Sequence, residues 1–359
     1  MNEVAAITDI PTGFSIVLCT YNGKSRLQAT MAHLAALQIP THHAIELLIV
    51  DNASTDGTAP FAKSVWNELN APFTLRLLTE NRSGKGYAIE TGYDAAFYSY
   101  ILTVDDDNWL CSDYLERATE ILNLDAEIGI LQGLSEGAFE SPVPDWAEKM
   151  KQCFVIGSPV QMPGYFPEKN FYVWGAGMVI KKNGWADLRK RGFAFLTSKI
   201  PGKAAGEDNE TALGFLLLGK KIYYSDKLKY KHYMPKDRIN WDKLKLTFEM
   251  WGYMNHFFFL YALVLDSYEK KYTITDNMIK KKFFNHMVIK SKSFTLKQHL
   301  AYWLKPQHDL YQLRLDYYYS LGKWFLKLNK TALRDISFLQ SWMFPLLKEN
   351  RSFEWQGGI

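Results

Sequence analysis

Three consecutive acidic residues, Asp105, Asp106 and Asp107, follow the apolar segment at 100–104. If that segment is a strand, side chains alternate, so Asp105 and Asp107 project to roughly the same side. Two carboxylates on one side form a hard-oxygen site suited to Mg²⁺ or Mn²⁺, especially one that phosphate oxygens complete. A solvated acidic turn or a helix cap is the alternative explanation. A calcium loop of EF-hand type is excluded, because Leu110 stands where its sharp turn needs glycine.

A second acidic group, Glu207, Asp208 and Glu210, stands at the expected start of a helix. The helix dipole favours acids there whatever the function. A carboxylate in this place can also act as a general base that removes a proton from an attacking hydroxyl. His232 could add a metal ligand through a neutral ring nitrogen, and the alternative is a purely structural histidine.

The elements that must position these residues follow from the hydrophobic pattern. Apolar, β-branched segments at 14–20, 45–51, 73–79 and 100–105 predict strands, and helical periodicity fills 25–37, 56–69 and 84–97. This alternation predicts an α/β fold, a Rossmann-like and mostly parallel sheet with helices on both faces. Ligands bind such sheets beyond the carboxyl ends of the strands. Since the four strands end in TYNG, DNASTDGT, ENRSGKG and DDDN, we expect one shared site there.

The loops after the second and third strands also have structural explanations. Ser54 or Thr55 is expected to cap a helix. Asp51 is not explained in this way, and it could accept hydrogen bonds from a base or a ribose. The segment at 80–86 offers backbone N–H groups and Lys85 just ahead of a helix, which suits a phosphate. It lacks the spacing of a P-loop, and a solvated loop is the alternative.

The chain divides into a tail at 1–13, a main domain at 14–240 with halves at 14–135 and 136–240, and a C-terminal helical region at 241–359. In the second half we expect a glycine-interrupted strand at 171–182, a helix at 206–221 and two short strands at 222–235. Beyond it, the pattern predicts helices at 241–265, 276–290, 295–304 and 307–328.

Composition limits the partners and the compartment. The longest apolar run, at 257–265, is far shorter than the roughly 20 residues of a membrane span, and the first 30 residues show no secretion signal. The three cysteines are far apart without a CxxC pair, so we expect reduced thiols in a cytoplasmic protein.

The C-terminal region is both basic and aromatic. Residues 236–359 hold 20 Lys and Arg against 11 Asp and Glu, net +9, and 26 of the 54 aromatic residues. This combination predicts contact with the inner face of a membrane. Packing on the main domain or on a second subunit of a homo-oligomer is the alternative. Nucleic acid is not an expected partner, because no RNA- or DNA-binding motif appears.

Taken together, the segments FSIVLCTYNG, LLIVDNASTDGT, NRSGKGYA, VDDDN, WGAGMVI, GEDNE and YKHYMP resemble the glycosyltransferases of family 2, which have the GT-A fold. The resemblance covers residues 14 to about 240. It implies an inverting transfer of sugar from a nucleotide sugar to an acceptor hydroxyl, with the domain at 14–240 catalytic. It also implies the roles of the site residues. Thr20, Tyr21, Asn22 and Asp51 would lie around the base and ribose, Asn81 and Lys85 would close the nucleotide pocket, and Trp174 and Gly175 would lie beneath the sugar. Asp105 would face the ribose or the metal, Asp107 would bind the metal together with His232, and Asp208 would be the base, with Glu207 competing for that role.

We therefore expect a metal-dependent glycosyltransferase of bacterial surface polysaccharide or glycolipid synthesis. A UDP-sugar is the favoured donor, and a saccharide or a polyprenyl-linked saccharide is the expected acceptor. Asn52, where the commoner family form has a second acid, weakens the preference for UDP. The alternatives are a sugar-nucleotide pyrophosphorylase, whose Gly- and Arg-rich loop is missing after the first strand, and a non-catalytic nucleotide- or carbohydrate-binding protein.

Overall fold

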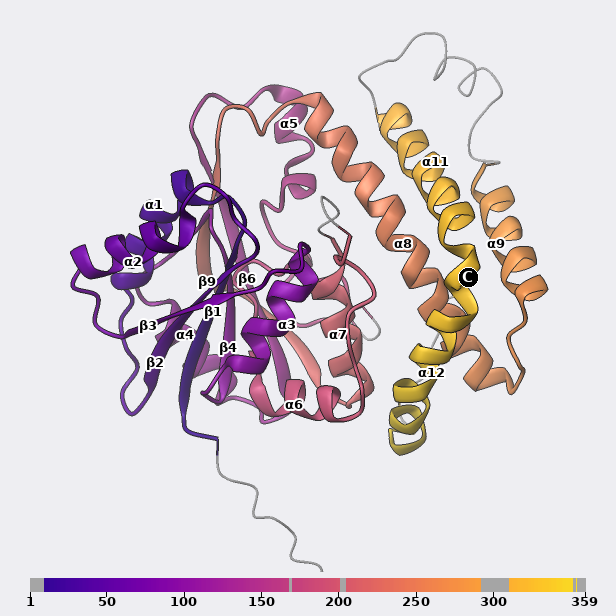
Figure 1. Cartoon of the computed structure of the whole chain (residues 1–359), viewed down its shortest axis with the longest axis horizontal. Coiled ribbons are helices and arrows are strands. Elements are labelled where there is room, and N and C mark those ends of the chain that lie inside the picture. The colour runs from indigo at the N-terminus through magenta and orange to yellow at the C-terminus, as the bar shows by residue number, and fades with distance from the viewer. Residues whose placement is uncertain (1–9, 168–169, 201–204, 292–309, 351–352, 354–359) are drawn as a thin grey trace, which may run out of the picture.

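The computed structural model describes residues 10–167, 170–200, 205–291, 310–350 and 353. A twisted sheet with helices on both faces forms one part of the molecule, and a group of long helices packs beside it (Figure 1). The predicted α/β fold with a C-terminal helical region is confirmed. The predicted helix at 295–304 lies outside the described residues.

The first half of the sheet is parallel. Its strands are β1 (Gly13–Thr20), β2 (Ala44–Asp51), β3 (Thr74–Thr79) and β4 (Tyr100–Asp105), in the order β3-β2-β1-β4. Every residue of β1 is buried, as a central strand requires. Thr20 pairs with Asp51, and Cys19 pairs with Asp105. The carboxyl ends of three strands are therefore level with one another.

Helices cover both faces of this sheet. Helices α1 (Lys24–Ala35), α2 (Thr58–Glu68) and α4 (Tyr114–Leu122) share one apolar core with alternate residues of β1 and β2. Helix α3 (Lys85–Ala95) packs on the opposite face, together with α6 (Lys182–Lys190) and α7 (Glu207–Leu217). The alternation of strand side chains produces these two cores.

The second half of the sheet is mixed. Strand β8 (Val179–Lys181) runs antiparallel to β4 and to β6 (Ile128–Phe139). Strand β9 (Lys221–Met234) runs parallel to β6. Two short strands, β5 (Asn108–Leu110) and β7 (Gly164–Tyr165), pair antiparallel with β9. The short α5 (Asp145–Glu148) and the 3₁₀ turn η1 (Lys151–Phe154) connect β6 to β7.

Two predictions in this half are wrong. The segment 222–235 forms one strand, β9, whose pairing register with β6 shifts between Ser225 and Lys229. This irregularity interrupts the alternation of apolar and polar residues along β9, so the sequence pattern predicted two strands instead of one. The segment 171–182 is a strand only at its end, and its first part is held by side chains.

The helical region comprises α8 (Trp241–Lys270), α9 (Asp276–Ser291), α11 (Leu310–Leu328), the 3₁₀ turn η2 (Asn329–Thr331) and α12 (Ala332–Glu349), which the sequence prediction missed. Its aromatics pack on the sheet part. The Tyr261 hydroxyl donates to Glu210 of α7 at 2.7 Å, and the rings of Trp342 and Phe193 lie edge to face at 5.0 Å. Among the described helices, none is long and apolar enough to span a membrane.

Candidate active site

Lys85 connects the two acidic groups that the sequence placed far apart. Its ammonium lies 3.0 Å from Oδ1 of Asp105, at the end of β4, and 3.3 Å from Oε1 of Glu207, in the first turn of α7. Burial alone would lower the pKa of Lys85, but the charges of Asp105 and Glu207 raise it well above its usual value. Lys85 is therefore a fixed positive charge at the carboxyl edge of the sheet.

Asp208 lies next to this group but is bound differently. Its Oδ2 accepts the backbone N–H of Gly175 at 3.0 Å, and its Oδ1 accepts the backbone and side-chain N–H groups of Asn209 at 2.8 and 2.7 Å. Burial and the charge of Glu207 raise the pKa of Asp208 to about 7, against the opposing effect of Lys85. A carboxylate with a pKa near neutrality can accept a proton in one step and lose it in the next.

Glu207, the competing base candidate, is held more tightly. One of its oxygens faces Lys85, and the other accepts the hydroxyl of Ser198. Its side chain is almost fully buried. Both carboxylate oxygens of Glu207 are therefore held by other side chains.

Three consecutive backbone N–H groups at the predicted sugar-binding segment donate to side chains. Val173 donates to Asn209 at 3.1 Å, Trp174 donates to Gln132 at 3.0 Å, and Gly175 donates to Asp208. Gln132 returns a bond to the carbonyl of Trp174 at 2.9 Å. These contacts replace a strand ladder, so the chain can curve past Asp208 here.

Sequence reasoning missed Gln132 and Asn209. Gln132 is 1% exposed on β6, and the available signal was a glutamine inside the apolar run ILQGL. A buried amide needs partners, so its presence there indicates a backbone to be held. Asn209 gave no signal, because a polar residue in the first turn of a helix is ordinary.

Asp106 and Asp107 form a turn between β4 and β5, so strand alternation ends at Asp105. Asp106 accepts the hydroxyl of Thr20 at 2.6 Å and two N–H groups of Arg26 at 2.8 Å. Thr20 is a residue predicted to line the nucleotide pocket, but its hydroxyl donates to the buried Asp106. Asp106, given no catalytic role by the sequence, fixes the end of β1.

Asp107 has its own partners. Its Oδ2 lies 2.5 Å from Nη1 of Arg238 and 3.5 Å from Nε2 of His232. Burial would raise the pKa of Asp107, but His232 and Arg238 hold it well below its usual value. Nδ1 of His232 is buried without a hydrogen-bond partner.

The predicted metal ligands are thus only partly brought together. Asp107 and His232 are neighbours, whereas Asp105 pairs with Lys85. Among the described residues, no three His, Cys, Asp or Glu side chains gather as a metal-binding group. The two that are neighbours fit a divalent cation that takes most of its ligands from a bound diphosphate.

The predicted nucleotide-binding residues line the ends of β1 and β2. Tyr21 is 57% exposed. Asn22, in the left-handed region at φ 47°, accepts from the backbone of Thr55 and donates its own N–H to Ser54. Ser54 and Thr55 therefore join two loops and cap no helix, since α2 begins at Thr58. Asp51 accepts the N–H of Ser54 at 3.1 Å.

Asn52 and Asn81 complete this side of the site. The Asn52 amide donates to the carbonyls of Glu80 and Arg82 at 3.0 and 2.7 Å and accepts the N–H of Gly84 at 2.9 Å. An acid could not donate those two bonds, which explains the asparagine found here. Asn81 is exposed in the loop that Asn52 holds.

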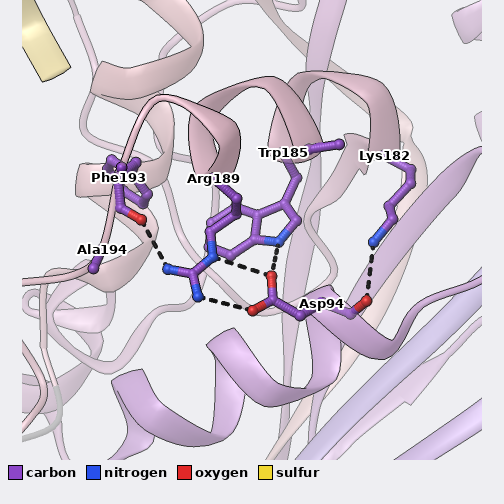
Figure 2. A pocket seen from close by; sticks show the side chains of 8 residues that line it. Asp94, Lys182, Trp185, Arg189, Phe193 and Ala194 are labelled. Atoms are coloured by element: carbon purple, nitrogen blue, oxygen red, sulfur yellow. Dashed lines mark hydrogen bonds and ion pairs between the residues drawn. The ribbon is translucent and has the colours of Figure 1, made fainter. Parts of the chain in front are cut away.

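A surface pocket of about 590 Å³ lies at the other end of α3, away from these residues. Figure 2 shows that its polar groups are bonded to each other: Asp94 accepts from Arg189 and Trp185, and Lys182 donates to the backbone beside Asp94. The polar groups of this pocket therefore stabilise the contact between α3 and α6, and the pocket is distinct from the candidate site.

Comparisons with known proteins identify the family and the fold of this chain. The model of Glycosyl transferase family 2 matches residues 15–194, half of the chain. Poly-beta-1,6-N-acetyl-D-glucosamine synthase of Staphylococcus aureus (strain COL) is 27% identical over 121 residues, 34% of this chain and 28% of that protein. The same synthase of Staphylococcus epidermidis is 27% identical over 145 residues, 40% of this chain and 34% of that protein. The matches thus span about a third of these relatives' length.

Solved structures share the fold. S. aureus TarS 1-349 in complex with UDP-GlcNAc has a TM-score of 0.53 at 15% identity, covering 96% of this chain and 93% of that one. A second TarS crystal structure has a TM-score of 0.50 at 15% identity, covering 92% and 54%. The sheet with its helical C-terminal region is common to both proteins. The family match over residues 15–194 establishes that this chain belongs to glycosyl transferase family 2.

Proposed function

We propose that this protein transfers a sugar from a nucleoside-diphosphate sugar to an acceptor hydroxyl, with inversion, and that Asp208 is the general base. The observation that carries the proposal is the environment of Asp208, a part-buried carboxylate with a pKa of about 7 at the start of α7, beside the charged group of Lys85, Asp105 and Glu207. A perturbed carboxylate beside fixed charges at the carboxyl edge of a sheet is characteristic of a catalytic site.

The chemistry is a single displacement. The acceptor hydroxyl gives its proton to Asp208 while its oxygen forms a bond to the anomeric carbon. The bond from that carbon to the diphosphate breaks on the opposite face, and its electron pair leaves on the phosphate oxygen. Asp208 later releases the proton to water. Its pKa near 7 supports both halves of this cycle.

Lys85 and the loops around it would hold the donor. Tyr21, Asn22, Asp51 and Asn81 would surround the base and ribose, and Lys85 would supply a fixed positive charge near the diphosphate. Trp174 and Gly175, held by Gln132 and Asp208, would lie beneath the sugar.

We propose that Asp107 and His232 would hold Mg²⁺ or Mn²⁺ when the donor is bound. Their facing atoms, Oδ2 of Asp107 and Nε2 of His232, are 3.5 Å apart, close enough for both to bind one ion. The cation would neutralise charge on the leaving diphosphate. Arg238, which now pairs with Asp107, would have to move toward the phosphates.

The acceptor we propose is a saccharide or a polyprenyl-linked saccharide in bacterial surface polysaccharide or glycolipid synthesis. The similar staphylococcal synthases are named for an N-acetylglucosamine polymer, and the TarS crystal structure holds UDP-GlcNAc. These names support testing UDP-GlcNAc first as the donor.

The test is release of nucleoside diphosphate from UDP-GlcNAc, UDP-glucose and GDP-mannose, with Mg²⁺, with Mn²⁺ and with EDTA. We expect turnover of a UDP-sugar that EDTA abolishes and that Asp107→Asn reduces strongly, with Asp113→Asn, a partly exposed aspartate paired with Arg117 just before α4, as the matched control. Absence of both turnover and binding for every donor would contradict the transferase proposal. Full turnover in EDTA would contradict only the metal.

A further inference from the structure

Helices α9 and α11 form an antiparallel pair at the outer side of the helical region (Figure 1). The rings of Phe283 and Phe325 stack at 3.6 Å between centroids and 6° between planes. One turn along, the Met287 methyl group lies 3.7 Å from the place that a Cβ on Gly322 would take. Because residue numbers rise on one helix as they fall on the other, the two helices run in opposite directions.

The residues that follow this stack are apolar and exposed. Phe284 is 67% exposed and Leu326 is 78% exposed. Each follows a buried neighbour by one position, a rotation of about 100° around its helix axis. On antiparallel helices this rotation brings both side chains to the same side. Tyr319, 37% exposed, lies two turns before Leu326 and extends the same face.

Lysines surround this apolar centre. The segments 276–287 and 319–330 hold six lysines and one acid, Asp276, which is paired with Lys280. Lys281, Lys323 and Lys327 are exposed, and Lys327 lies over the ring of Trp324. We name Phe284, Leu326, Tyr319, Lys281, Lys323 and Lys327 the α9–α11 face.

Helix α12 is also apolar and carries basic residues, but its apolar side chains are not available to a partner. Trp342, Met343, Leu346 and Leu347 of α12 are buried in the core shared with α6 and α7. Exposed apolar side chains and exposed lysines therefore occur together on the α9–α11 face.

We propose that the α9–α11 face docks on a lipid bilayer that contains anionic phospholipid. Phe284 and Leu326 would enter the boundary between headgroups and acyl chains, and the lysines would contact the lipid phosphates. A second copy of this chain is a poorer occupant, because it would bring the same lysines against these ones. The inference concerns a surface on the side of the molecule formed by α9 and α11, so it does not depend on the proposed transferase activity.

The test is flotation of the full chain with phosphatidylcholine vesicles, with and without phosphatidylglycerol. We expect binding only with phosphatidylglycerol, weakened by salt. The pairs Phe284→Ser with Leu326→Ser and Lys281→Glu with Lys323→Glu should each lower the bound fraction by about tenfold. The matched control is Leu124→Ser with Met162→Ser, 70% and 74% exposed on the sheet part, which should bind as the unaltered chain does.

Thermal unfolding of each variant shows whether it is folded. Equal binding to both vesicles, no binding to either, or unchanged binding by both altered pairs would overturn the proposal. So would a dimer of the unaltered chain that both pairs convert to monomer without any vesicle binding, because that result assigns the face to a second copy.

Discussion

The ammonium of Lys85 lies 3.3 Å from Oε1 of Glu207, and this contact joins the start of α3 to the start of α7. The two helices come from opposite halves of the sheet part. The acids of α7 thus lie beside the end of β4 because one part-buried lysine compensates charges from both.

Replacing Lys85 by Met should weaken the fold because it removes a charge. It leaves Asp105 and Glu207 without their counter-charge, so we expect the free energy of unfolding to fall by about 2 kcal/mol at pH 8, below the value for a fully buried pair because 27% of the Lys85 side chain is exposed. Lys85→Arg keeps the charge and should lose much less. Urea unfolding measures both variants, with Lys24→Met as an exposed control. An equal loss in Lys85→Met and Lys85→Arg would contradict the role of charge.

Asp208 should make stability fall as pH rises. Its pKa is raised to about 7 in the folded protein and is about 3.9 in an unfolded chain, so the folded state binds the extra proton between these values. Its contribution is complete below the lower value and is lost as pH rises through 7. Relative to the unaltered protein, Asp208→Asn should therefore gain in melting temperature from pH 5 to pH 8. A constant difference would mean that the pKa is not raised.

Asn52→Asp should loosen the loop that carries Asn81 and precedes Lys85. The new carboxylate would face the carbonyls of Glu80 and Arg82 without donating to them, at a cost of about 2 kcal/mol. We expect weaker nucleotide binding by calorimetry and a lower melting temperature. Asn123→Asp, on the surface at the end of α4, is the control. Tighter nucleotide binding would show that residue 52 contacts the ligand directly.

Gln132→Met keeps the size of the side chain but removes both bonds to Trp174. Two buried backbone groups are then unpaired, which costs about 2 to 4 kcal/mol. If this segment lies beneath the sugar, KM for the donor rises more than kcat falls. Steady-state kinetics separates the two, and Gln38→Met, an exposed site, is the comparison. Stability lost with unchanged KM would limit Gln132 to a structural role.

The first half of the fold could be predicted because its elements follow local periodicity. Strands such as 14–20 alternate cleanly with helices, and the polar residues at their ends share one edge by geometry. The second half depends on contacts distant in sequence. Gln132 holds Trp174 and Glu210 binds residues 196 and 197, so the curve at 173–175 has no local signature.

For the site, residue types at the strand ends predicted that Asp105 and Lys85 lie at one edge of the sheet, and the family resemblance implied Asp208 as the base. Which of these side chains pair with each other depends on side-chain direction. Asp107 leaves the direction of Asp105 because a turn begins at Asp106, and that turn is stabilised by Arg26 of a distant helix. A sequence pattern alone does not specify such a contact.

The central claim is that Asp208 accepts the proton of the acceptor. The most direct measurement is turnover of the donor by Asp208→Asn beside Glu207→Gln and the partly exposed control Asp113→Asn, with UDP binding measured on each. The account predicts that kcat falls about 10³-fold in Asp208→Asn while UDP affinity is kept, and that Glu207→Gln loses much less. Turnover by Asp208→Asn equal to that of the unaltered enzyme would contradict it.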